Sequence, residues 1–227
     1  ELVAEVRAGI NTRNIAISAD GRVVAVANYL PKTLVMLDAD LRLLRMIPAT
    51  TAVGRTTSRV SAVYQAAPRE SFVVALKDIP EMWEISYAEV PPPVLADFVE
   101  SHENGRADAL VANDDAFPIR RVPLTAPLDD FFFDPTYRLV MGSARGAGKA
   151  VVVHLDVRRE IAEIAMPGLP HLGSGISWMR NGARVMATPH LGKGRISVIN
   201  MDDWSEIATI DTLGPGFFMR SHEDTPY

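Results

Sequence analysis

The sequence predicts an all-β protein, a β-propeller of four-stranded antiparallel blades that is present as an arc of a larger ring. Short runs rich in β-formers alternate with tight turns, and helical periodicity is nowhere evident. The first turn of each unit falls near Asp20, Pro68, Pro135, Asn181 or Glu223, roughly 40 to 48 residues apart with one wider gap, which is the period of propeller blades. About three and a half blades are recognisable, fewer than a closed ring usually needs. A two-sheet sandwich is less favoured, because the units recur in tandem with similar turn placement.

The first unit spans residues 1–47. Leu2, Ala4 and Val6 fall on one face of an extended chain, which predicts an opening strand over residues 1–6. Asp20-Gly21 then separates two β-rich runs, and Asp-Gly is among the strongest hairpin signals in a sequence. Apolar runs at 33–37 and 43–47 complete a sheet of antiparallel strands.

The same pattern returns three times. Each later unit begins with an apolar run and continues through a turn rich in Pro, Asp, Asn or Gly into further β-rich runs. Strands are predicted at 60–64, 72–76 and 81–85 in the second unit, at 131–133, 139–141, 150–155 and 159–164 in the third, and at 176–178, 185–187, 195–199 and 206–210 in the fourth.

Residues 90–118 interrupt the second unit. The segment opens with Val90-Pro-Pro-Pro93, which favours a stiff polyproline II spacer, and continues through a polar stretch from 100 to 115. We therefore predict one partial propeller domain over residues 1–227, with 90–118 as an excursion between two of its strands.

The composition limits the possible functions. The chain has 227 residues, of which 48% are hydrophobic and 22% charged, as expected for a globular body with a sizeable core. A net charge of -5 without a Lys- or Arg-rich run argues against nucleic acid as a partner. The absence of cysteine excludes disulfides, iron–sulfur clusters, thiolate zinc sites and c-type haem attachment within this segment. No apolar run reaches the ~18 residues of a membrane span, so none is expected.

Two Pro-His-Leu-Gly steps, at His171 and His190, are the strongest functional signal. Each step meets a short apolar run, so both imidazoles are predicted in loops at the ends of neighbouring strands. Because the loops on one face of a propeller converge on its axis, two histidines from adjacent blades would reach one ligand there. The alternative is that each histidine only hydrogen-bonds loop carbonyls.

Asp129 and Asp130 directly precede or open the very apolar strand predicted at 131–133. They occupy the same point in their unit as the glycine-rich segment before Ile176 in the next one. Asp129 is predicted to face the axial cavity, where desolvation favours the protonated carboxyl and suits it to proton transfer. Asp130 is predicted to cap the turn, and the same role is the alternative for Asp129.

Four cationic residues border strand ends in different units: Arg13, Arg59, Lys77 and Arg220. Scattered cations are normally solvated, but a ring of them around a cavity suits a ligand with several carboxylates. The sequence contains no catalytic serine motif, P-loop, dinucleotide fingerprint or HExxH. Hydrolase and nucleotide chemistry are therefore not supported.

At these residues the chain resembles the d1-haem domain of the cytochrome cd1 nitrite reductase family, along nearly its whole length. Residues 3–13 resemble the family's Ala-Glu-Ile-Lys-x-Gly-Ile-Glu-Ala-Arg segment, and Ala27-Asn-Tyr29-Leu-Pro31 resembles its Ala-Tyr-Trp-Pro loop. Leu169-Pro-His171-Leu-Gly-Ser-Gly175 is similar to its Pro-His-Pro-Gly-Arg-Gly loop, and residues 188–199 to its Ser-His-Leu-Gly-Asp-Gly-Ser-Ile-Ser-Leu-Ile strand. As a set these matches are specific.

The resemblance implies an eight-bladed propeller that binds haem d1 or dihydro-haem d1, of which this chain is an arc. His171 matches a distal active-site histidine of the family and would serve as a distal metal ligand or as a base. Asp129 or His190 would help to move protons. The carboxylates of the cofactor would be held by cationic and aromatic residues: Arg13, Tyr29, Arg59, Lys77 and Arg220.

One departure from the family bears on the reaction. In the reductase the second distal histidine lies in a Leu-His-Asp-Gly-Gly-Trp-Asp loop, whereas residues 128–134 here read Leu-Asp-Asp-Phe-Phe-Phe-Asp. Losing that imidazole argues against nitrite reduction, because the histidine pair supplies the protons. Together with residues 214–222, this segment looks most like that of the family branch that dehydrogenates a propionate of dihydro-haem d1 during cofactor biosynthesis. A second biosynthetic branch of the family is almost as similar. The alternatives are the nitrite reductase d1 domain and a non-enzymatic propeller that binds a tetrapyrrole or a protein.

The resemblance also implies parts outside this chain. The family's proximal haem ligand and a cytochrome c domain with haem c would lie upstream of Glu1, so this segment alone is expected to bind d1-type haem poorly. The first residues lack the basic and apolar regions of a signal peptide, and we expect the chain to begin inside a longer one. The family implies a periplasmic location, with cytochrome cd1 nitrite reductase or an electron-transfer protein as partner. Exposed edge strands would allow self-association.

Overall fold

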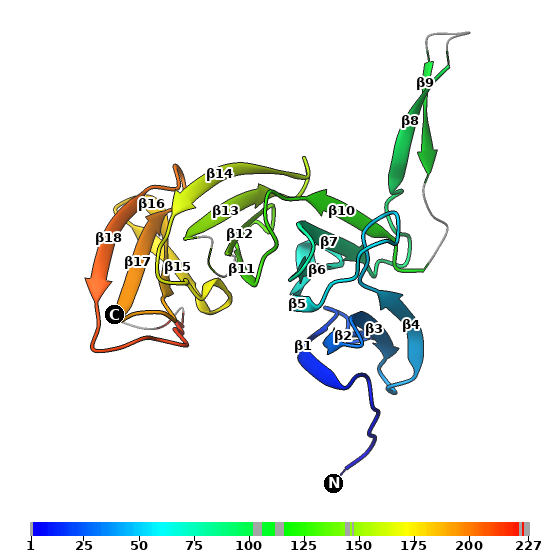
Figure 1. The fold of residues 1–227 in the computed structure, drawn as a ribbon, viewed down its shortest axis with the longest axis horizontal. Helices are drawn as coiled ribbons and strands as arrows, with labels where there is room; N and C mark the ends of the chain where they lie inside the picture. Colours follow the sequence, from blue (N-terminus) through cyan, green and yellow to red (C-terminus); the bar gives the residue numbers. More distant parts are fainter. Residues whose placement is uncertain are drawn as a thin grey trace. The chain divides into compact units, whose positions relative to one another are not determined.

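The computed structural model describes residues 2–101, 106–111, 116–143, 146, 148–222 and 224, with the backbone alone described at 95–101 and 106–111. Its strands form four sheets of four antiparallel strands each and one two-stranded sheet (Figure 1). The chain divides into two compact units, residues 1–74 with 82–122 and residues 75–81 with 123–227. Each unit is described by itself.

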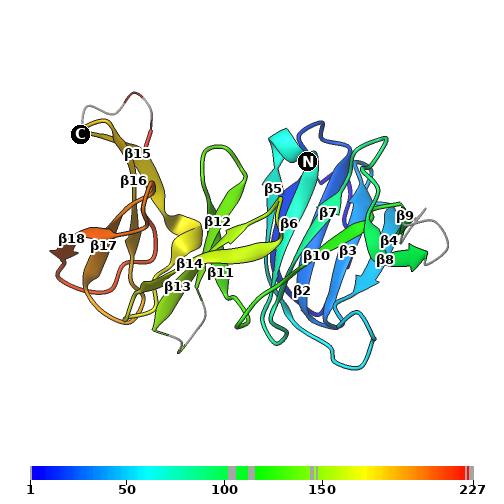
Figure 2. The ribbon, with the colours of Figure 1, turned by 90° about the horizontal axis from the view of Figure 1, so that it is seen from above.

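The first sheet contains β1 (Asn11–Ile17), β2 (Val23–Leu30), β3 (Thr33–Asp38) and β4 (Leu43–Pro48) in chain order (Figure 2). Its first turn confirms the hairpin predicted at Asp20-Gly21. Gly21 has a φ of 73°, in the left-handed region that glycine adopts without strain. The Asp20 carboxylate accepts hydrogen bonds from the Ser18 hydroxyl at 2.6 Å and from the Arg22 backbone N–H at 3.0 Å, which closes the turn.

The opening strand predicted for residues 1–6 is wrong over residues 2–6, and Glu1 lies outside the described residues. Residues 2–9 belong to no sheet, and Val3 is 94% exposed. An extended run becomes a strand only where a neighbour satisfies its backbone N–H and C=O groups. Pairing begins where the Ile10 N–H donates to the Leu30 carbonyl at 3.0 Å. Just before it, the Asn28 amide donates to the Ala8 carbonyl at 2.9 Å and ties the segment to β2.

The second sheet has the order β10-β7-β6-β5. Its strands are β5 (Val60–Ala66), β6 (Ser71–Leu76), β7 (Glu81–Ser86) and β10 (Ile119–Pro123). Every residue of β6 is buried, and so is every residue of β7 after the first. Trp83 of β7 is fully buried, with the Arg121 guanidinium 4.8 Å from its ring centroid. This sheet therefore holds the most deeply buried side chains of the first unit.

Between β7 and β10 the chain forms a separate two-stranded antiparallel sheet, β8 (Leu95–Ser101) with β9 (Arg106–Val111). This sheet falls within the excursion predicted for residues 90–118, and β10 resumes the second sheet after it. The strand that completes the second sheet is thus β10, which the sequence pattern did not mark.

The second unit contains the third and fourth sheets, each in chain order. The third is formed by β11 (Asp130–Phe133), β12 (Leu139–Ser143), β13 (Lys149–His154) and β14 (Arg159–Ala165). The fourth is formed by β15 (Ile176–Arg180), β16 (Ala183–Pro189), β17 (Arg195–Asn200) and β18 (Glu206–Asp211). The short 3-10 helix η2 (Leu172–Ser174) lies between them. All eight strands confirm the predicted runs, with shifted ends.

One buried cluster joins the third and fourth sheets. Met141 and Val152 of the third sheet share it with Met186 and Ile199 of the fourth and with Leu172 of η2. Burying side chains of this size stabilises a fold by roughly 1.5–3 kcal/mol each. Because Leu172 is fully buried, the cluster also anchors the turn that carries the first Pro-His step.

Four-stranded antiparallel sheets that follow one another along the chain confirm the predicted all-β fold of propeller blades. The number of blades in a closed ring stays a prediction. In the part of the chain described above, no helix has the length and hydropathy needed to cross a bilayer.

We expect Trp83→Ala to lower the free energy of unfolding by about 3–5 kcal/mol, because it opens a cavity among fully buried neighbours. Trp178→Ala is the matched control. Trp178 is 36% exposed, and its loss is expected to cost less than about 1 kcal/mol. Guanidinium chloride titration followed by circular dichroism measures both, and equal losses would contradict the burial of Trp83.

Candidate functional site

The two Pro-His-Leu-Gly loops lie side by side in the second unit. Pro170 and His190 form an isolated antiparallel bridge, and the His171 N–H donates to the Pro189 carbonyl at 2.9 Å. The first loop connects β14 of the third sheet to β15 of the fourth, and the second connects β16 to β17 within the fourth sheet. The predicted position of the two histidines in loops at the ends of neighbouring strands is therefore confirmed, and the prediction that both reach one ligand stays a prediction.

Glycines permit this close pairing. The Gly192 N–H donates to the Gly168 carbonyl at 2.9 Å. A Cβ on Gly192 would lie only 3.0 Å from that carbonyl oxygen, and Gly168 itself has a φ of 103°. The glycine of the second step, Gly192, is thus explained by backbone approach rather than by chemistry.

His171 is held through both ring nitrogens. Its Nε2 lies 3.3 Å from Oδ2 of Asp130, and its Nδ1 lies 2.5 Å from the Phe217 carbonyl oxygen. A carbonyl oxygen only accepts hydrogen bonds, so Nδ1 carries the hydrogen and Nε2 faces the carboxylate. The same Asp130 oxygen accepts the Gly173 N–H at 3.1 Å, which fixes it against η2. The ring therefore contacts a loop carbonyl, as the alternative to a ligand-binding role predicts, and a carboxylate as well, and its role toward a ligand stays a prediction.

The segment that supplies this carbonyl also supplies an aromatic wall. The rings of Phe217 and Phe218 lie at steep angles to the His171 ring, with centroids 5.9 and 5.8 Å away. The two phenylalanines are 62% and 70% exposed, so their faces are open to solvent. Arg220, predicted to bind a carboxylate, is exposed, and its guanidinium lies 5.5 Å from the centroid of the Phe218 ring.

Backbone contacts hold this C-terminal segment against the His190 loop. The Gly216 N–H donates to the His190 carbonyl at 3.1 Å, and the Thr212 N–H donates to the Gly194 carbonyl at 3.0 Å. A Cβ on Gly194 would lie 2.3 Å from the Thr212 carbonyl oxygen, so a larger residue there would displace the segment. The position of the Phe217 carbonyl therefore depends on the second Pro-His loop.

Lys77 and Asp129 form an ion pair with each other. Their side chains are only 16% and 18% exposed, so the pair is sheltered from water. The adjacent ammonium favours the charged carboxylate, which opposes the protonated form predicted for Asp129. Lys77 already has a carboxylate partner from the chain, so holding a ligand carboxylate would require this pair to open.

His190 turns its ring into the fourth sheet, where it is fully buried. Its Nε2 lies 2.9 Å from the Ser197 hydroxyl, which donates to Oε1 of Glu206 at 2.7 Å. Ser197 uses its hydrogen on Glu206, so the ring donates from Nε2, and Nδ1 has no hydrogen-bond partner among the described residues. Burial, and then the charges of Arg195 and Lys193, lower the pKa of His190. The structure does not support the prediction that this imidazole reaches a ligand at the loops.

Three predicted cofactor-binding residues belong to the first unit. Arg13 is exposed on β1. Tyr29 lies near the end of β2, and Arg59 directly precedes β5, so their contact links the first two sheets. The Arg59 guanidinium lies 5.4 Å from the Tyr29 ring centroid, within cation–π range. The ligand-binding roles of all three residues stay predictions.

Two groups of the site were missed by sequence reasoning: the Asp130 carboxylate and the Phe217 carbonyl. Asp130, predicted to cap a turn, contacts His171, whereas Asp129 pairs with Lys77. Asp130 opens β11. The acid doublet before an apolar strand was the available signal for it. A backbone carbonyl gives no such signal.

The two contacts of the His171 ring fix its orientation and place Nε2 beside the Asp130 carboxylate. His171 is also a predicted metal ligand, and coordination would require one of its two contacts to open. Within the described ranges, no group of three or more His, Cys, Asp or Glu side chains is placed to hold a metal ion.

Comparison with known proteins finds a family and several relatives that are similar to this chain. The family described as Cytochrome D1 heme domain matches residues 1–227. The chain is 50% identical over 228 residues to the dihydro-heme d1 dehydrogenase of Pseudomonas aeruginosa, and 29% identical over 221 residues to Protein NirF of the same organism. It also resembles the solved structure of dihydro-heme d1 dehydrogenase NirN in complex with DHE, with a TM-score of 0.82 and 49% identity.

The chain spans about half or less of each relative. The match to the dehydrogenase covers 100% of this chain and 41% of the relative, and the match to NirF covers 95% and 52%. The structural match covers 97% of this chain and 42% of the solved one.

Removing the Asp130 carboxylate is expected to loosen η2. In Asp130→Ala the Gly173 N–H loses its acceptor and His171 loses its ionic neighbour, at a cost of about 1–3 kcal/mol for a buried unsatisfied group. The Gly173 amide is expected to exchange with solvent faster, as measured by hydrogen–deuterium exchange. Asp129→Ala is the matched control and leaves this amide unchanged, so equal exchange in the two variants would contradict the assignment.

The lowered pKa of His190 makes stability depend on pH. As pH falls below the ordinary value of 6.5, the unfolded chain takes up the proton first, so the free energy of unfolding falls. One such group contributes at most about 1.4 kcal/mol per pH unit. We expect His190→Gln to show a smaller loss between pH 7 and pH 5 than the wild type in urea titrations, and His154→Gln to behave as the wild type does. An unchanged pH dependence in His190→Gln would show that the ring is not the titrating group.

Proposed function

The chain belongs to the cytochrome D1 heme domain family, and we propose that it forms part of a propeller that binds a d1-type haem. For the whole protein we propose dehydrogenation of a propionate side chain of dihydro-haem d1. The 50% identity to a dihydro-heme d1 dehydrogenase over this entire chain supports the proposal. The observation that carries it is His171, which resembles the family's distal histidine and is held between the Asp130 carboxylate and the Phe217 carbonyl.

The residues around His171 fit a flat ligand that carries carboxylates. Phe217 and Phe218 offer open ring faces beside the imidazole, and Arg220 adds a cation over one of them. When bound, the tetrapyrrole supplies the saturated side chain and a redox-active iron. Arg13 and Arg59, both in the first unit, are the further candidates for its carboxylates.

His171 is suited to take up a proton from the substrate. Converting a –CH2–CH2– unit to –CH=CH– removes two electrons and two protons. One proton would pass to Nε2 of His171, because Nδ1 is already committed to the Phe217 carbonyl, and this requires the contact between Nε2 and Asp130 to open toward the substrate. The second proton would leave to solvent, and the two electrons would pass to the upstream haem c domain or the electron-transfer protein proposed below. Asp130 then acts as a positioning residue that orients the ring and stabilises its positive charge.

Nitrite reduction is less well supported. The resemblance implies two proton-donating histidines for that reaction, and the aligned segment here carries Asp129 and Asp130 instead. In the structure Asp129 is paired with Lys77 rather than offered as a second proton donor. A propeller that binds the tetrapyrrole without converting it is the competing proposal.

We further propose the properties that only the family resemblance supports. These are a haem c domain upstream of this segment, a periplasmic location within denitrification, and cytochrome cd1 nitrite reductase or an electron-transfer protein as partner. We also propose that the protein self-associates through exposed edge strands, which offer unpaired backbone groups to another chain.

Reconstitution of the full-length protein with dihydro-haem d1 is expected to give red-shifted d1-type absorbance and conversion to haem d1. We expect His171→Gln to lower kcat by about 100-fold or more, with a small change in KM, because a lost general base typically costs that much. His154→Gln is the matched control, since His154 ends β13 and its Nδ1 accepts the Asp156 N–H at 3.3 Å. If the wild type binds dihydro-haem d1 without converting it, the competing proposal of a non-enzymatic binding propeller is favoured. Equal losses of kcat in His171→Gln and His154→Gln would contradict the role of His171.

A further inference from the structure

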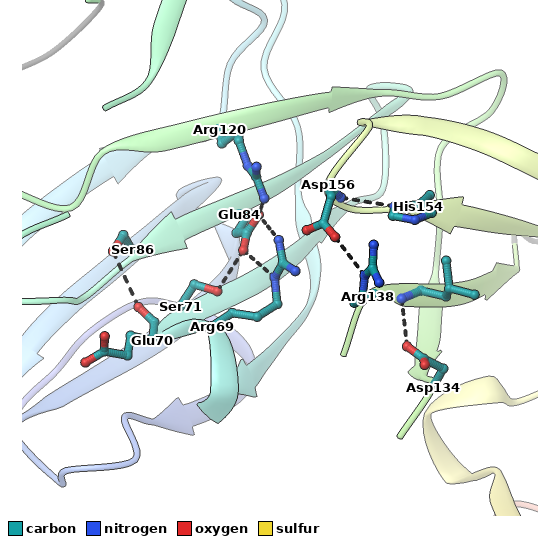
Figure 3. A network of polar contacts seen from close by, with 11 residues as sticks. Arg69, Glu70, Ser71, Glu84, Ser86, Arg120, Asp134, Arg138, His154 and Asp156 are labelled. Carbon is teal, nitrogen blue, oxygen red and sulfur yellow. Dashed lines mark hydrogen bonds and ion pairs between the residues drawn. The ribbon is translucent and has the colours of Figure 1, made fainter. Parts of the chain in front are cut away.

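The second sheet contains a pocket that the proposed function does not use. It has a volume of about 290 Å³ and lies where β6 begins and β7 ends. Ser71 and Ser86 lie on its lining, with Arg69, Glu84 and Arg120 beside them (Figure 3). β6 starts at Ser71 beside this pocket and ends at Leu76, directly before Lys77, so the pocket lies a strand length from that proposed haem-binding residue.

Glu84 forms the centre of the pocket floor and is held by three donors. Arg69 binds it through two nitrogens, Nε at 2.7 Å from Oε1 and Nη2 at 3.2 Å from Oε2. The Ser71 hydroxyl donates to Oε1 at 3.1 Å, and Nη2 of Arg120 donates to Oε2. The carboxylate is thus fully engaged, with only 8% of its side chain exposed.

The described lining carries two cationic side chains and one carboxylate. Burial opposes ionisation of Glu84, but the hydrogen bonds and charges of Arg69 and Arg120 outweigh it, and the pKa of Glu84 is lowered. The lining therefore places two guanidiniums around one ionised carboxylate.

Arg120 is the cation that a ligand can reach. Its side chain is 30% exposed, compared with 14% for Arg69. A guanidinium carries five N–H donors in a planar fork that matches a carboxylate, and the contact with Glu84 occupies Nη2. The remaining donors of Arg120 are suited to a second, external carboxylate.

The walls of the pocket select for a small apolar body. Pro92, Pro93 and Pro118 line it together with Val94. Proline has no N–H and a fixed φ, so these walls are rigid and offer no hydrogen-bond donor to a polar ligand. A flat apolar group attached to a carboxylate would match both the walls and the floor.

From this geometry we propose that the pocket binds a small organic carboxylate with a planar apolar body, at a site separate from the d1-haem site. Without such a ligand, the Arg69–Glu84–Arg120 cluster would serve only to tie β6, β7 and β10 together. The two accounts differ in one respect: a purely structural cluster shows no saturable, charge-dependent binding.

Titration of the full-length protein with benzoate, followed by isothermal calorimetry and amide chemical shifts, tests the proposal. We expect saturable benzoate binding that Arg120→Gln weakens by about tenfold or more, because the accessible fork is lost. Arg138→Gln is the matched control. Arg138 lies just before β12 and pairs with Asp156 at 3.0 Å in an exposed position, and it is not among the residues that line the pocket, so its loss removes the same charge and leaves the lining intact.

Two further arms separate the parts of the ligand. Benzamide keeps the ring without the charge, acetate keeps the charge without the ring, and both are expected to bind at least about tenfold more weakly than benzoate. If Arg120→Gln does not fold, Arg120→Lys keeps the charge but loses the fork, and it is expected to weaken benzoate binding while keeping the native circular dichroism spectrum.

Absence of saturable binding to the wild type, equal binding by folded Arg120→Gln, or binding of benzamide as tight as benzoate would overturn the proposal. Dihydro-haem d1 turnover is a separate readout, so failure here does not touch the proposed function.

Discussion

The short backbone bridge between Pro170 and His190 is the interaction on which the site depends. It places two nearly identical tetrapeptides side by side, yet it sends their imidazoles to different places. The first step precedes a strand, so His171 projects beside η2 toward Asp130. The second follows β16, so His190 turns into the sheet toward Ser197. The bridge also anchors the C-terminal segment, because the His190 carbonyl accepts the Gly216 N–H next to Phe217. One imidazole is therefore buried in the sheet, and the other lies at the loops beside Asp130.

Carboxylates that are largely sheltered from water have different kinds of partner in this chain. Asp129 pairs with one ammonium, Lys77. Asp130 lies beside the His171 imidazole and accepts the backbone N–H groups of Phe131 and Gly173. Glu84 is held by two guanidiniums and by the Ser71 hydroxyl. A charged group out of water must be paired, and the kind of partner decides what else can bind beside it.

The sequence predicted the blades because their signals are local. Turn residues and apolar runs set each hairpin, as at Asp20-Gly21, without information from elsewhere in the chain. The supposed strand over residues 2–6 failed for the opposite reason, since pairing needs a partner that only the fold provides. At the site, His171 was identifiable from its loop. The role of Asp130 depends on the register that pairs it with Ser143, and the Phe217 carbonyl reaches His171 from 46 positions away through an atom that every residue possesses.

The contacts of His171 bear on the direction in which a proton moves. A reductive site must deliver protons, which favours several acids open to the substrate and replenished from solvent. Here the hydrogen on Nδ1 is directed at a backbone carbonyl, and the remaining nitrogen, which carries no hydrogen in the neutral ring, lies beside the Asp130 carboxylate. The neighbouring acid, Asp129, is paired with Lys77. The one hydrogen of the neutral ring is therefore already used within the protein, and the other nitrogen is the one that can accept a proton. This geometry supports our proposal that hydrogen is removed from a substrate rather than delivered to one.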